Sequence, residues 1–350
     1  MKIALVGGGT GGHVFPLLAL YNYLLKDNDF EFIWIGEKNS LEEKIAKENS
    51  IKFYCVRSGK LRRYFSFKNF YEPFLNIFGF FNVLGILKKE KVETIFLKGG
   101  YVSLATSLAG KLLGKKIIIH ESDSIPGLSS RMIGKFANKV FLTFNKASEY
   151  FPKEKTKVIG QILNPLLFYP PVSSFSTGLG IHEKFDKTQL LVTGGSQGSS
   201  RIFDFVLNNI NELSGFDITV ILGTLNTSYK EKFEKYDFVK AYEFVSQEHF
   251  AEIYAKTDIA ISRAGATTLF ELENFGILTF IIPLKGSANN HQFYNALEFE
   301  KKGNFVFTEE NLNNDLLNKL LEYNHYKKNP DFAPNYEETL KKIEKELKIK

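Results

Sequence analysis

The stretch that decides the fold is Met1-Lys2-Ile3-Ala4-Leu5-Val6-Gly7-Gly8-Gly9-Thr10-Gly11-Gly12-His13 at the start of the chain. Ile3–Val6 is short and continuously apolar, which is typical of a strand buried on both faces of a parallel sheet. The glycines after it allow a tight turn, and Phe15–Lys26 has the pattern of a helix. A strand, a glycine-rich turn and a helix in this order predict an α/β domain whose helix N-terminus suits an anionic ligand.

The same alternation continues along both halves of the chain. In the first half, strands are predicted at Ile3–Val6, Glu31–Ile35, Thr94–Leu97, Lys116–His120 and Lys139–Thr143, and helices at Phe15–Lys26, Leu41–Asn49, Leu104–Leu113 and Leu128–Phe136. In the second half, strands are predicted at Gln189–Thr193, Asp217–Leu222, Val239–Glu243, Ile259–Ile261 and Thr279–Pro283, and helices at Ile202–Asn211, Phe250–Ala255 and Thr267–Glu273. Alternation of this kind predicts parallel sheets with right-handed crossovers, so the fold class is α/β.

A proline- and serine-rich segment separates the two halves. Residues 164–180 contain three prolines and a run of serines, which is typical of a linker. We therefore expect one domain at 1–163 and another at 164–350. The Lys/Glu-rich amphipathic helix predicted at Tyr336–Lys350 either stays with the second domain or packs back on the first.

Composition limits the classes of protein that fit. The chain has 350 residues, 44% of them hydrophobic, and a formal net charge of +6, which permits an anionic partner without choosing one. Cys55 is the only cysteine, so no disulfide or Cys-based zinc site can form within the chain. The longest apolar run, Phe74–Leu87, is shorter than the roughly 20 residues of a membrane-spanning helix.

Two glycine loops bear on the ligand. Gly7-x-Gly9-x-x-Gly12 fits the dinucleotide fingerprint, and Glu37 lies where a ribose-binding acid would follow the second strand. Gly194-Gly195-Ser196-Gln197-Gly198-Ser199 is a second phosphate-type loop, in the other domain. A two-domain transferase needs both loops, whereas an NAD or FAD enzyme of this size rarely does. The pair therefore favours a transferase over a dinucleotide enzyme or two plain turns.

Further loops at strand ends carry polar side chains. Arg263–Glu271 places Glu271 within reach of a ribose diol, although a first-turn carboxylate also suits the helix dipole. Asn289-Asn290-His291-Gln292 offers neutral donors and acceptors for sugar hydroxyls, unless it is a solvated loop. His120-Glu121-Ser122-Asp123 and Gly99–Ser103 end two more strands, where open α/β sheets bind ligands.

Together these motifs resemble the family of UDP-GlcNAc:muramyl-pentapeptide-undecaprenyl-pyrophosphate GlcNAc transferases. The matching motifs, in the family's order, are Gly8–Pro16, Gly99–Ser103, His120-Glu121, Ile125–Leu128, Gly194–Ser199, Arg263–Glu271 and Gln292-x-x-Asn295-Ala296. The resemblance implies a B-type glycosyltransferase fold, with two Rossmann-like domains facing across a cleft. It implies that the C-terminal domain binds UDP-GlcNAc and the N-terminal domain binds the undecaprenyl-linked muramyl pentapeptide.

The implied reaction is single-displacement, inverting transfer of GlcNAc to the C4 hydroxyl of the acceptor in peptidoglycan synthesis, a process on which cell shape and division depend. It uses no cofactor, no obligatory metal and no nucleic acid, and neither loop region contains an Asp-x-Asp pair.

The resemblance also implies site residues. His13 is the first choice for the general base because its ordinary pKa suits neutral pH, with Glu121 and Asp123 as alternatives. Gly99, Gly100 and Tyr101 are expected to bind the acceptor. The expected substrate contacts are Thr10, Gly11, Gly12, His13, Asp123, Asn164, Ser196, Gln197, Gly198, Val245, Ala266, Thr267, Thr268, Glu271, His291 and Gln292. Three positions depart from the family pattern: Asp123 replaces an Asn, His291 replaces one of two glutamines, and Leu166-Leu167 stand where an Arg is common.

A polyprenyl acceptor requires contact with a bilayer. Lys60–Lys91 interleaves aromatic residues with lysine and arginine, which predicts docking on the anionic cytoplasmic face of the cell membrane as a peripheral protein. The alternative is that these aromatic side chains fill the core. Other cell-wall synthesis proteins are expected partners at that surface.

Three other functions stay open from the sequence: a related transferase with a diacylglycerol acceptor, a nicotinamide oxidoreductase, and a lipid- or sugar-binding protein without activity.

Overall fold

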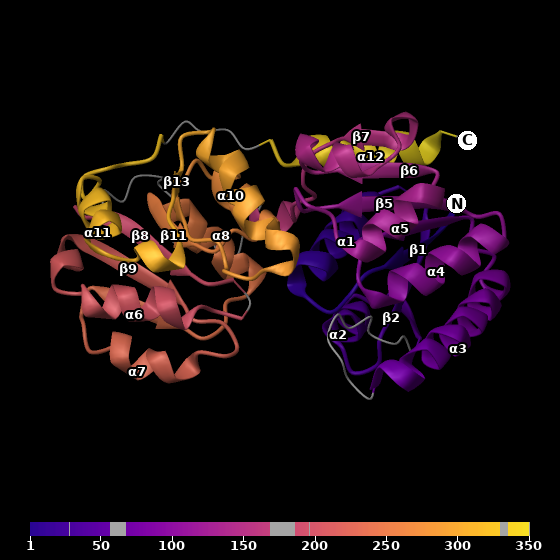
Figure 1. The fold of residues 1–350 in the computed structure, drawn as a ribbon, viewed down its shortest axis with the longest axis horizontal. Helices are drawn as coiled ribbons and strands as arrows, with labels where there is room; N and C mark the ends of the chain where they lie inside the picture. The colour runs from indigo at the N-terminus through magenta and orange to yellow at the C-terminus, as the bar shows by residue number, and fades with distance from the viewer. Residues whose placement is uncertain (28, 57–67, 169–185, 196, 330–334, 350) are drawn as a thin grey trace. The chain divides into compact units, whose positions relative to one another are not determined.

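The chain folds into two compact α/β units. The computed structural model describes residues 1–27, 29–56, 68–168, 186–195, 197–329 and 335–349, so most of the predicted linker lies outside the described residues. Met1–Asn164 and Glu337–Lys350 form the first unit, and Pro165–Tyr336 forms the second. Every strand pair in both sheets is parallel, which confirms the predicted fold class (Figure 1).

The first unit contains, in its described part, a seven-stranded sheet in the order β3-β2-β1-β4-β5-β6-β7. Its strands are β1 (Lys2–Val6), β2 (Glu31–Gly36), β3 (Lys52–Cys55), β4 (Thr94–Leu97), β5 (Lys116–Glu121), β6 (Lys139–Leu142) and β7 (Thr156–Val158). Its helices are α1 (Gly11–Leu24), α2 (Leu41–Glu48), α3 (Lys68–Lys89), α4 (Tyr101–Leu112), α5 (Leu128–Phe136) and α12 (Glu337–Lys348).

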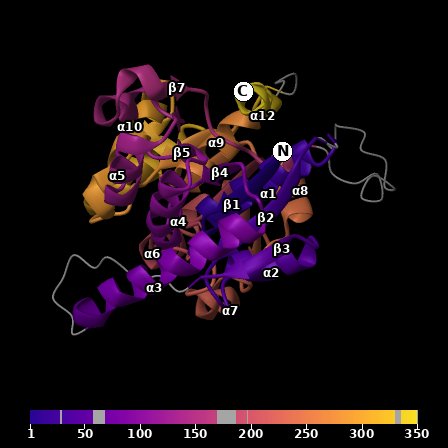
Figure 2. The same cartoon turned by 90° about the vertical axis from the view of Figure 1, so that its right-hand side faces the viewer.

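Alternate residues of β1 enter two different cores. Ile3 and Leu5 pack in the core that includes residues of α1 and α12, whereas Ala4 and Val6 pack with residues of α3, α4 and α5. Figure 2 shows these two groups of helices on opposite sides of the strands. Because both faces of the sheet are covered, the strand is apolar at every position from Ile3 to Val6 rather than at every second one.

Helix α12 completes the first unit although it follows the whole second unit in sequence. It buries Leu340, Ile343 and Leu347 in the core beside α1. Lys116 Nζ donates to the carbonyl oxygens of Glu346 at 3.1 Å and Ile349 at 2.6 Å, so a cation lies at the helix C-terminus, where the dipole favours it.

The second unit repeats the same architecture. Its described sheet has the order β10-β9-β8-β11-β12-β13. The strands are β8 (Thr188–Thr193), β9 (Phe216–Ile221), β10 (Val239–Tyr242), β11 (Ile259–Ser262), β12 (Leu278–Ile281) and β13 (Phe305–Val306). The helices are α6 (Ser200–Asn208), α7 (Lys230–Phe233), α8 (Gln247–Lys256), α9 (Ala266–Asn274), α10 (His291–Glu300) and α11 (Asn314–Leu321). Residues of α6, α7 and α11 fill one core and residues of α8 and α9 fill another.

Candidate active site

The strand order places the glycine loops at corresponding points of the two units. In the first sheet, β1 lies between β2 and β4, so the direction in which strands are added reverses there. The loops after β1 and β4 are therefore neighbours at a topological switch point, where open α/β sheets bind ligands. In the second sheet, β8 lies between β9 and β11, which makes the loops Gly194–Ser199 and Arg263–Gly265 neighbours in the same way.

The two loops of the first unit pack backbone against backbone. Gly99 and Gly100 have φ angles of +92° and +90°, which residues with a side chain rarely adopt. A Cβ on Gly100 would lie 3.2 Å from the carbonyl oxygen of Gly8. Thr10 is the exposed N-cap of α1 and its side chain makes no cap hydrogen bond. The N–H groups of Gly11–Gly12 begin the helix without acceptors inside it, so donors gather at this point.

His13 has one ring nitrogen engaged by the loop. Its Nδ1 lies 3.1 Å from the carbonyl oxygen of Gly8, and since a carbonyl only accepts, Nδ1 carries the hydrogen and Nε2 is the basic nitrogen. A Cβ on Gly99 would lie 3.4 Å from Nε2, so the glycine leaves space beside it. Burial is the main reason why the pKa of His13 is below its ordinary value, and the charge of Lys98 lowers it further. The hydrogen bond with the Gly8 carbonyl acts in the opposite direction and raises the pKa. The imidazole is thus neutral at pH 7, as a general base has to be.

A buried lysine that the sequence analysis did not single out lies beside these loops. Lys98 follows β4, and its Nζ contacts His120 Nδ1 and Ser122 Oγ. Burial lowers the pKa of Lys98 to about 7. His120 Nε2 donates to the carbonyl oxygen of Gly160 at 2.9 Å. Both ring nitrogens of His120 are therefore engaged inside the unit, which suits a structural role for this histidine.

Glu121 and Asp123 form the turn that follows β5. Glu121 Oε1 accepts a hydrogen bond from the Asp123 N–H at 3.0 Å, and Glu121 is buried. Burial, followed by the charge of Asp123, raises the pKa of Glu121. These contacts suit Glu121 for shaping the turn, and Asp123 is the more accessible of the two carboxylates.

The loop after β8 is packed so closely that it requires glycine. Gly198 has a φ angle of +79°, and a Cβ on it would lie 1.9 Å from the carbonyl oxygen of Leu222. Asn226 Nδ2 donates to the carbonyl oxygen of Gln197 at 2.8 Å, and Ser199 caps α6 with its side chain. The loop thereby holds its remaining donors at the N-terminus of α6, which is the arrangement of an anion site.

Arg263 braces the neighbouring loop. Its guanidinium donates to the carbonyl oxygens of Ile282–Pro283 at 3.2 and 3.3 Å and forms an ion pair of 2.5 Å with Glu309. The fully buried Asn295 donates from Nδ2 to the carbonyl oxygen of Ala264 at 3.2 Å. These bonds connect the ends of β11 and β12 with α10 and fix the point at which α9 begins.

Glu271 lies in the second turn of α9, after the first-turn residues Ala266–Thr268. Its carboxylate accepts a hydrogen bond from the hydroxyl of Tyr254 at 3.1 Å. Burial raises the pKa of Glu271 to about 7, and the bond from Tyr254 opposes that shift. The side chain of Val245 is buried in the same core as Tyr254, which leaves its backbone as the part that a ligand can contact.

The four polar residues predicted as one loop divide between two elements. Asn289 and Asn290 belong to a short 3-10 turn and both have φ angles of 54°, whereas His291 and Gln292 begin helix α10. The prediction of a loop is wrong for these last two residues. Gln292 Oε1 accepts from the Leu284 N–H at 2.9 Å, so its amide nitrogen is the group left to donate to a ligand.

For three of the predicted contact residues, the structure shows no side chain that is open to a ligand. Ser196 is outside the described residues, and Tyr101 begins α4 with a side chain that is likewise not described. Asn164 is buried at the last position of the first unit's N-terminal segment.

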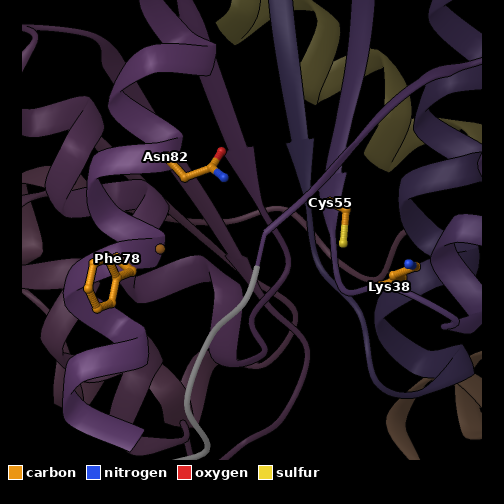
Figure 3. Close-up of a pocket in the computed structure, with 5 residues that line it drawn as sticks. Lys38, Cys55, Phe78 and Asn82 are labelled. Atoms are coloured by element: carbon orange, nitrogen blue, oxygen red, sulfur yellow. The ribbon is translucent and has the colours of Figure 1, made fainter.

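A pocket of about 270 Å³ in the described part of the chain is lined by residues outside the glycine loops. Figure 3 labels lining residues from three parts of the first unit: Phe78 and Asn82 come from α3, Cys55 ends β3, and Lys38 precedes α2. Its volume is below the range of about 300–1,000 Å³ that is usual for ligand sites. Among the described residues, no three His, Cys, Asp or Glu side chains are grouped as a metal site requires. We therefore place the candidate active site at the two switch points.

Two family models match the chain. Residues 3–142 match the glycosyltransferase family 28 N-terminal domain, and residues 189–348 match the glycosyltransferase family 28 C-terminal domain. The chain belongs to glycosyltransferase family 28.

Curated family 28 relatives match it over most of their length. The chain is 36% identical over 321 residues to a protein of Clostridium perfringens named UDP-N-acetylglucosamine--N-acetylmuramyl-(pentapeptide) pyrophosphoryl-undecaprenol N-acetylglucosamine transferase, which covers 91% of this chain and 88% of that protein. A protein of Clostridium tetani with the same name is 35% identical over 362 residues, covering 100% and 99% of the two chains.

Solved structures share the fold of this family 28 chain. The MurG of Acinetobacter baumannii superposes with a TM-score of 0.73 at 23% identity, covering 98% of this chain and 99% of that one. A UDP-GlcNAc 2-epimerase of Neisseria meningitidis, solved with UDP-GlcNAc, superposes with a TM-score of 0.67 at 13% identity, covering 99% and 100%. Since MurG and a UDP-GlcNAc 2-epimerase share this fold, the fold alone does not decide the reaction.

Proposed function

We propose that this family 28 protein transfers N-acetylglucosamine from UDP-GlcNAc to the C4 hydroxyl of MurNAc-(pentapeptide)-pyrophosphoryl-undecaprenol. The observation that carries the proposal is that relatives named for this transfer are 35–37% identical to the chain over 88–100% of its length. The two switch-point sites support it, because each supplies groups suited to one of the two substrates.

The second unit is proposed to hold the donor. The rigid loop Gln197–Ser199 and the N-termini of α6 and α9 present main-chain donors to the diphosphate. Glu271 accepts from the ribose hydroxyls, and the Gln292 amide together with His291 contacts the sugar. These fixed dipoles stabilise the charge that grows on UDP as it leaves.

The first unit is proposed to hold and activate the acceptor. His13 Nε2 removes the proton of the C4 hydroxyl while the oxygen attacks C1 of GlcNAc. The bond from C1 to the diphosphate oxygen breaks, UDP leaves with the electron pair, and the configuration at C1 inverts. Asp123 is the alternative base, and Gly99 and Gly100 supply backbone room for the acceptor.

An exposed apolar face on the first unit suits a membrane-bound acceptor. The apolar face consists of Ile77, Phe78 and Phe81 on α3, Leu108 and Leu112 on α4, and Leu128 and Met132 on α5. Helix α3 packs on α4, and α4 packs on α5, as Figure 2 shows. Exposed Lys88, Lys111 and Lys135 lie on the same helices. We assign peripheral docking on an anionic cytoplasmic leaflet to this face.

Part of the predicted docking segment cannot be placed. Residues 60–67, including Arg62 and Arg63, lie outside the described residues. No helix in the described part of the chain has the length and apolar character needed to cross a bilayer.

The contacts of the first loop disfavour a nicotinamide enzyme. Glu42 Oε2 accepts from the Gly9 N–H at 3.4 Å, so a carboxylate already occupies a donor that a dinucleotide pyrophosphate would use. A diacylglycerol transferase would share the donor site and differ in the acceptor.

A transfer assay tests the proposal. Labelled UDP-GlcNAc and a short-chain lipid-linked muramyl peptide are expected to give UDP and the disaccharide-linked lipid. Transfer to diacylglycerol but not to the muramyl lipid would overturn the acceptor. Binding of UDP-GlcNAc without release of UDP would overturn the enzymatic activity.

A further inference from the structure

A buried glutamate connects the first glycine loop with the loop of the next strand. Glu42 lies in the first turn of α2 and is 1% exposed. Its Oε2 accepts from the Gly9 N–H at 3.4 Å, and its Oε1 accepts from the Glu37 N–H at 3.2 Å. A buried carboxylate is tolerated when main-chain donors satisfy it, and here the donors come from the ends of two adjacent strands.

Two glycines leave the space that this carboxylate occupies. A Cβ on Gly8 would lie 2.1 Å from Glu42 Oε1, and a Cβ on Gly36 would lie 2.6 Å from Glu42 Cγ. A side chain at either position would overlap the glutamate. Gly8 is therefore required by Glu42, whether or not an anion binds the loop.

The peptide bond between Gly8 and Gly9 lies between Glu42 and His13. Its N–H donates to Glu42, and its carbonyl oxygen accepts from His13 Nδ1 at 3.1 Å. Because a peptide unit is planar, fixing its N–H also fixes the direction of its carbonyl. The carbonyl in turn sets which nitrogen of His13 carries the hydrogen and where Nε2 points.

We propose that Glu42 is a positioning residue that orients the Gly8–Gly9 peptide and, through it, the His13 ring as a base with a free Nε2. The inference rests on the proposed role of His13 in transfer. The charged groups that act on His13 are Lys98, Asp123 and Glu42 itself.

Steady-state kinetics with Glu42→Gln test this role. An amide cannot accept from both N–H groups, so kcat is expected to fall about 10-fold to 100-fold, as misplaced catalytic groups do. UDP affinity is expected to stay unchanged, because the donor groups belong to the second unit. The acid limb of the pH–rate profile should move to lower pH, since the Glu42 charge raises the pKa of His13. Glu43→Gln is the matched control, because Glu43 accepts from the Asn39 N–H and pairs with Lys47 instead.

A double-variant comparison separates positioning from general destabilisation. Adding Glu42→Gln to His13→Ala is expected to cause no further loss of kcat, because Glu42 acts through His13. Losses that multiply, or a Glu42→Gln enzyme with the parent's kcat, would overturn the inference. If Glu42→Gln does not fold, Glu42→Asp, which keeps the charge on a shorter side chain, is measured the same way.

Nitrogen-15 shifts of the His13 ring test the same point without substrate. The parent should be in the Nδ1–H form, and Glu42→Gln should populate the Nε2–H form as well. An unchanged tautomer would refute Glu42's role, whereas a parent that fails to use the muramyl lipid would refute only the proposed function.

Discussion

Replacing Glu271 by glutamine should make the folded protein more stable at high pH and lower its affinity for UDP. The pKa of Glu271 is raised to about 7 by burial, so the folded protein binds a proton that the unfolded chain has already released. Between pH 4.5 and 7 stability therefore falls as pH rises, and the full cost of ionising the carboxylate is present above pH 7. Glutamine keeps an oxygen for the Tyr254 hydroxyl and carries no charge, which removes that cost.

The size of the effect follows from the pKa. The difference between 4.5 and about 7 corresponds to at most about 3 kcal/mol at pH 8 and less than about 1 kcal/mol at pH 5, at 1.4 kcal/mol for each unit of pKa. Because Glu271 is only partly buried, the gain at pH 8 should fall below that limit. Loss of a charge-assisted bond to the ribose should weaken UDP binding by about 1.5–3 kcal/mol, or roughly 10-fold to 100-fold.

Urea denaturation at pH 5 and pH 8 and calorimetric titration with UDP measure the two effects. Glu273→Gln is the control on the same helix, because Glu273 pairs with Lys302 at 2.7 Å on the surface and should change neither quantity by much. If Glu271→Gln destabilises the protein equally at both pH values, the carboxylate is ionised and stabilising in the fold, and the reasoning fails.

Three further predictions concern the loops, the base and the membrane. Gly198→Ala should raise the donor KM and lower the melting temperature more than Gly195→Ala does. Both glycines have positive φ angles, but only a Cβ at position 198 would meet backbone atoms, so equal effects would contradict the packing argument. His13→Ala should lower kcat about 10²–10⁴-fold with UDP affinity retained, and a larger loss for Asp123→Asn than for His13→Ala would reassign the base. Phe78→Ser with Phe81→Ser should reduce sedimentation with anionic vesicles relative to Leu25→Ser, an exposed leucine at the end of α1, and parental binding would place the docking surface elsewhere.

The alternation of strands and helices could be predicted because both faces of each sheet are buried. The strand predicted at Thr94–Leu97 contains the continuous apolar run Ile95–Leu97 between polar residues, and the structure has a strand at that position. Helix α3 was not predicted, because apolar residues occupy most positions of Phe74–Leu87, which leaves little contrast between faces, and because Pro73 interrupts the pattern. Strand β13 has only two residues, Phe305–Val306, which is too short to give a periodic signal.

The site could be predicted only as separate loops. Which loops become neighbours depends on strand order, and that order is set by contacts distant in sequence. Glu42 was missed because a glutamate just after the helix cap Ser40 is usually solvated. The glycines at 8 and 36 were the available signal, although only the fold shows that both make room for one side chain. Lys98 was missed for the same reason, since a single lysine after a strand is usually exposed.

The place of helix α12 has a consequence for the order in which the molecule is made. On the ribosome, the strands β1–β7 emerge early, but the helix that covers Leu17, Leu20 and their neighbours is synthesised only after the whole of Pro165–Tyr336. Part of the first unit's apolar core therefore stays uncovered while the second unit is translated and can already fold. The emergence of α12 is the event that closes the first unit, so this unit is completed last although its strands are translated first.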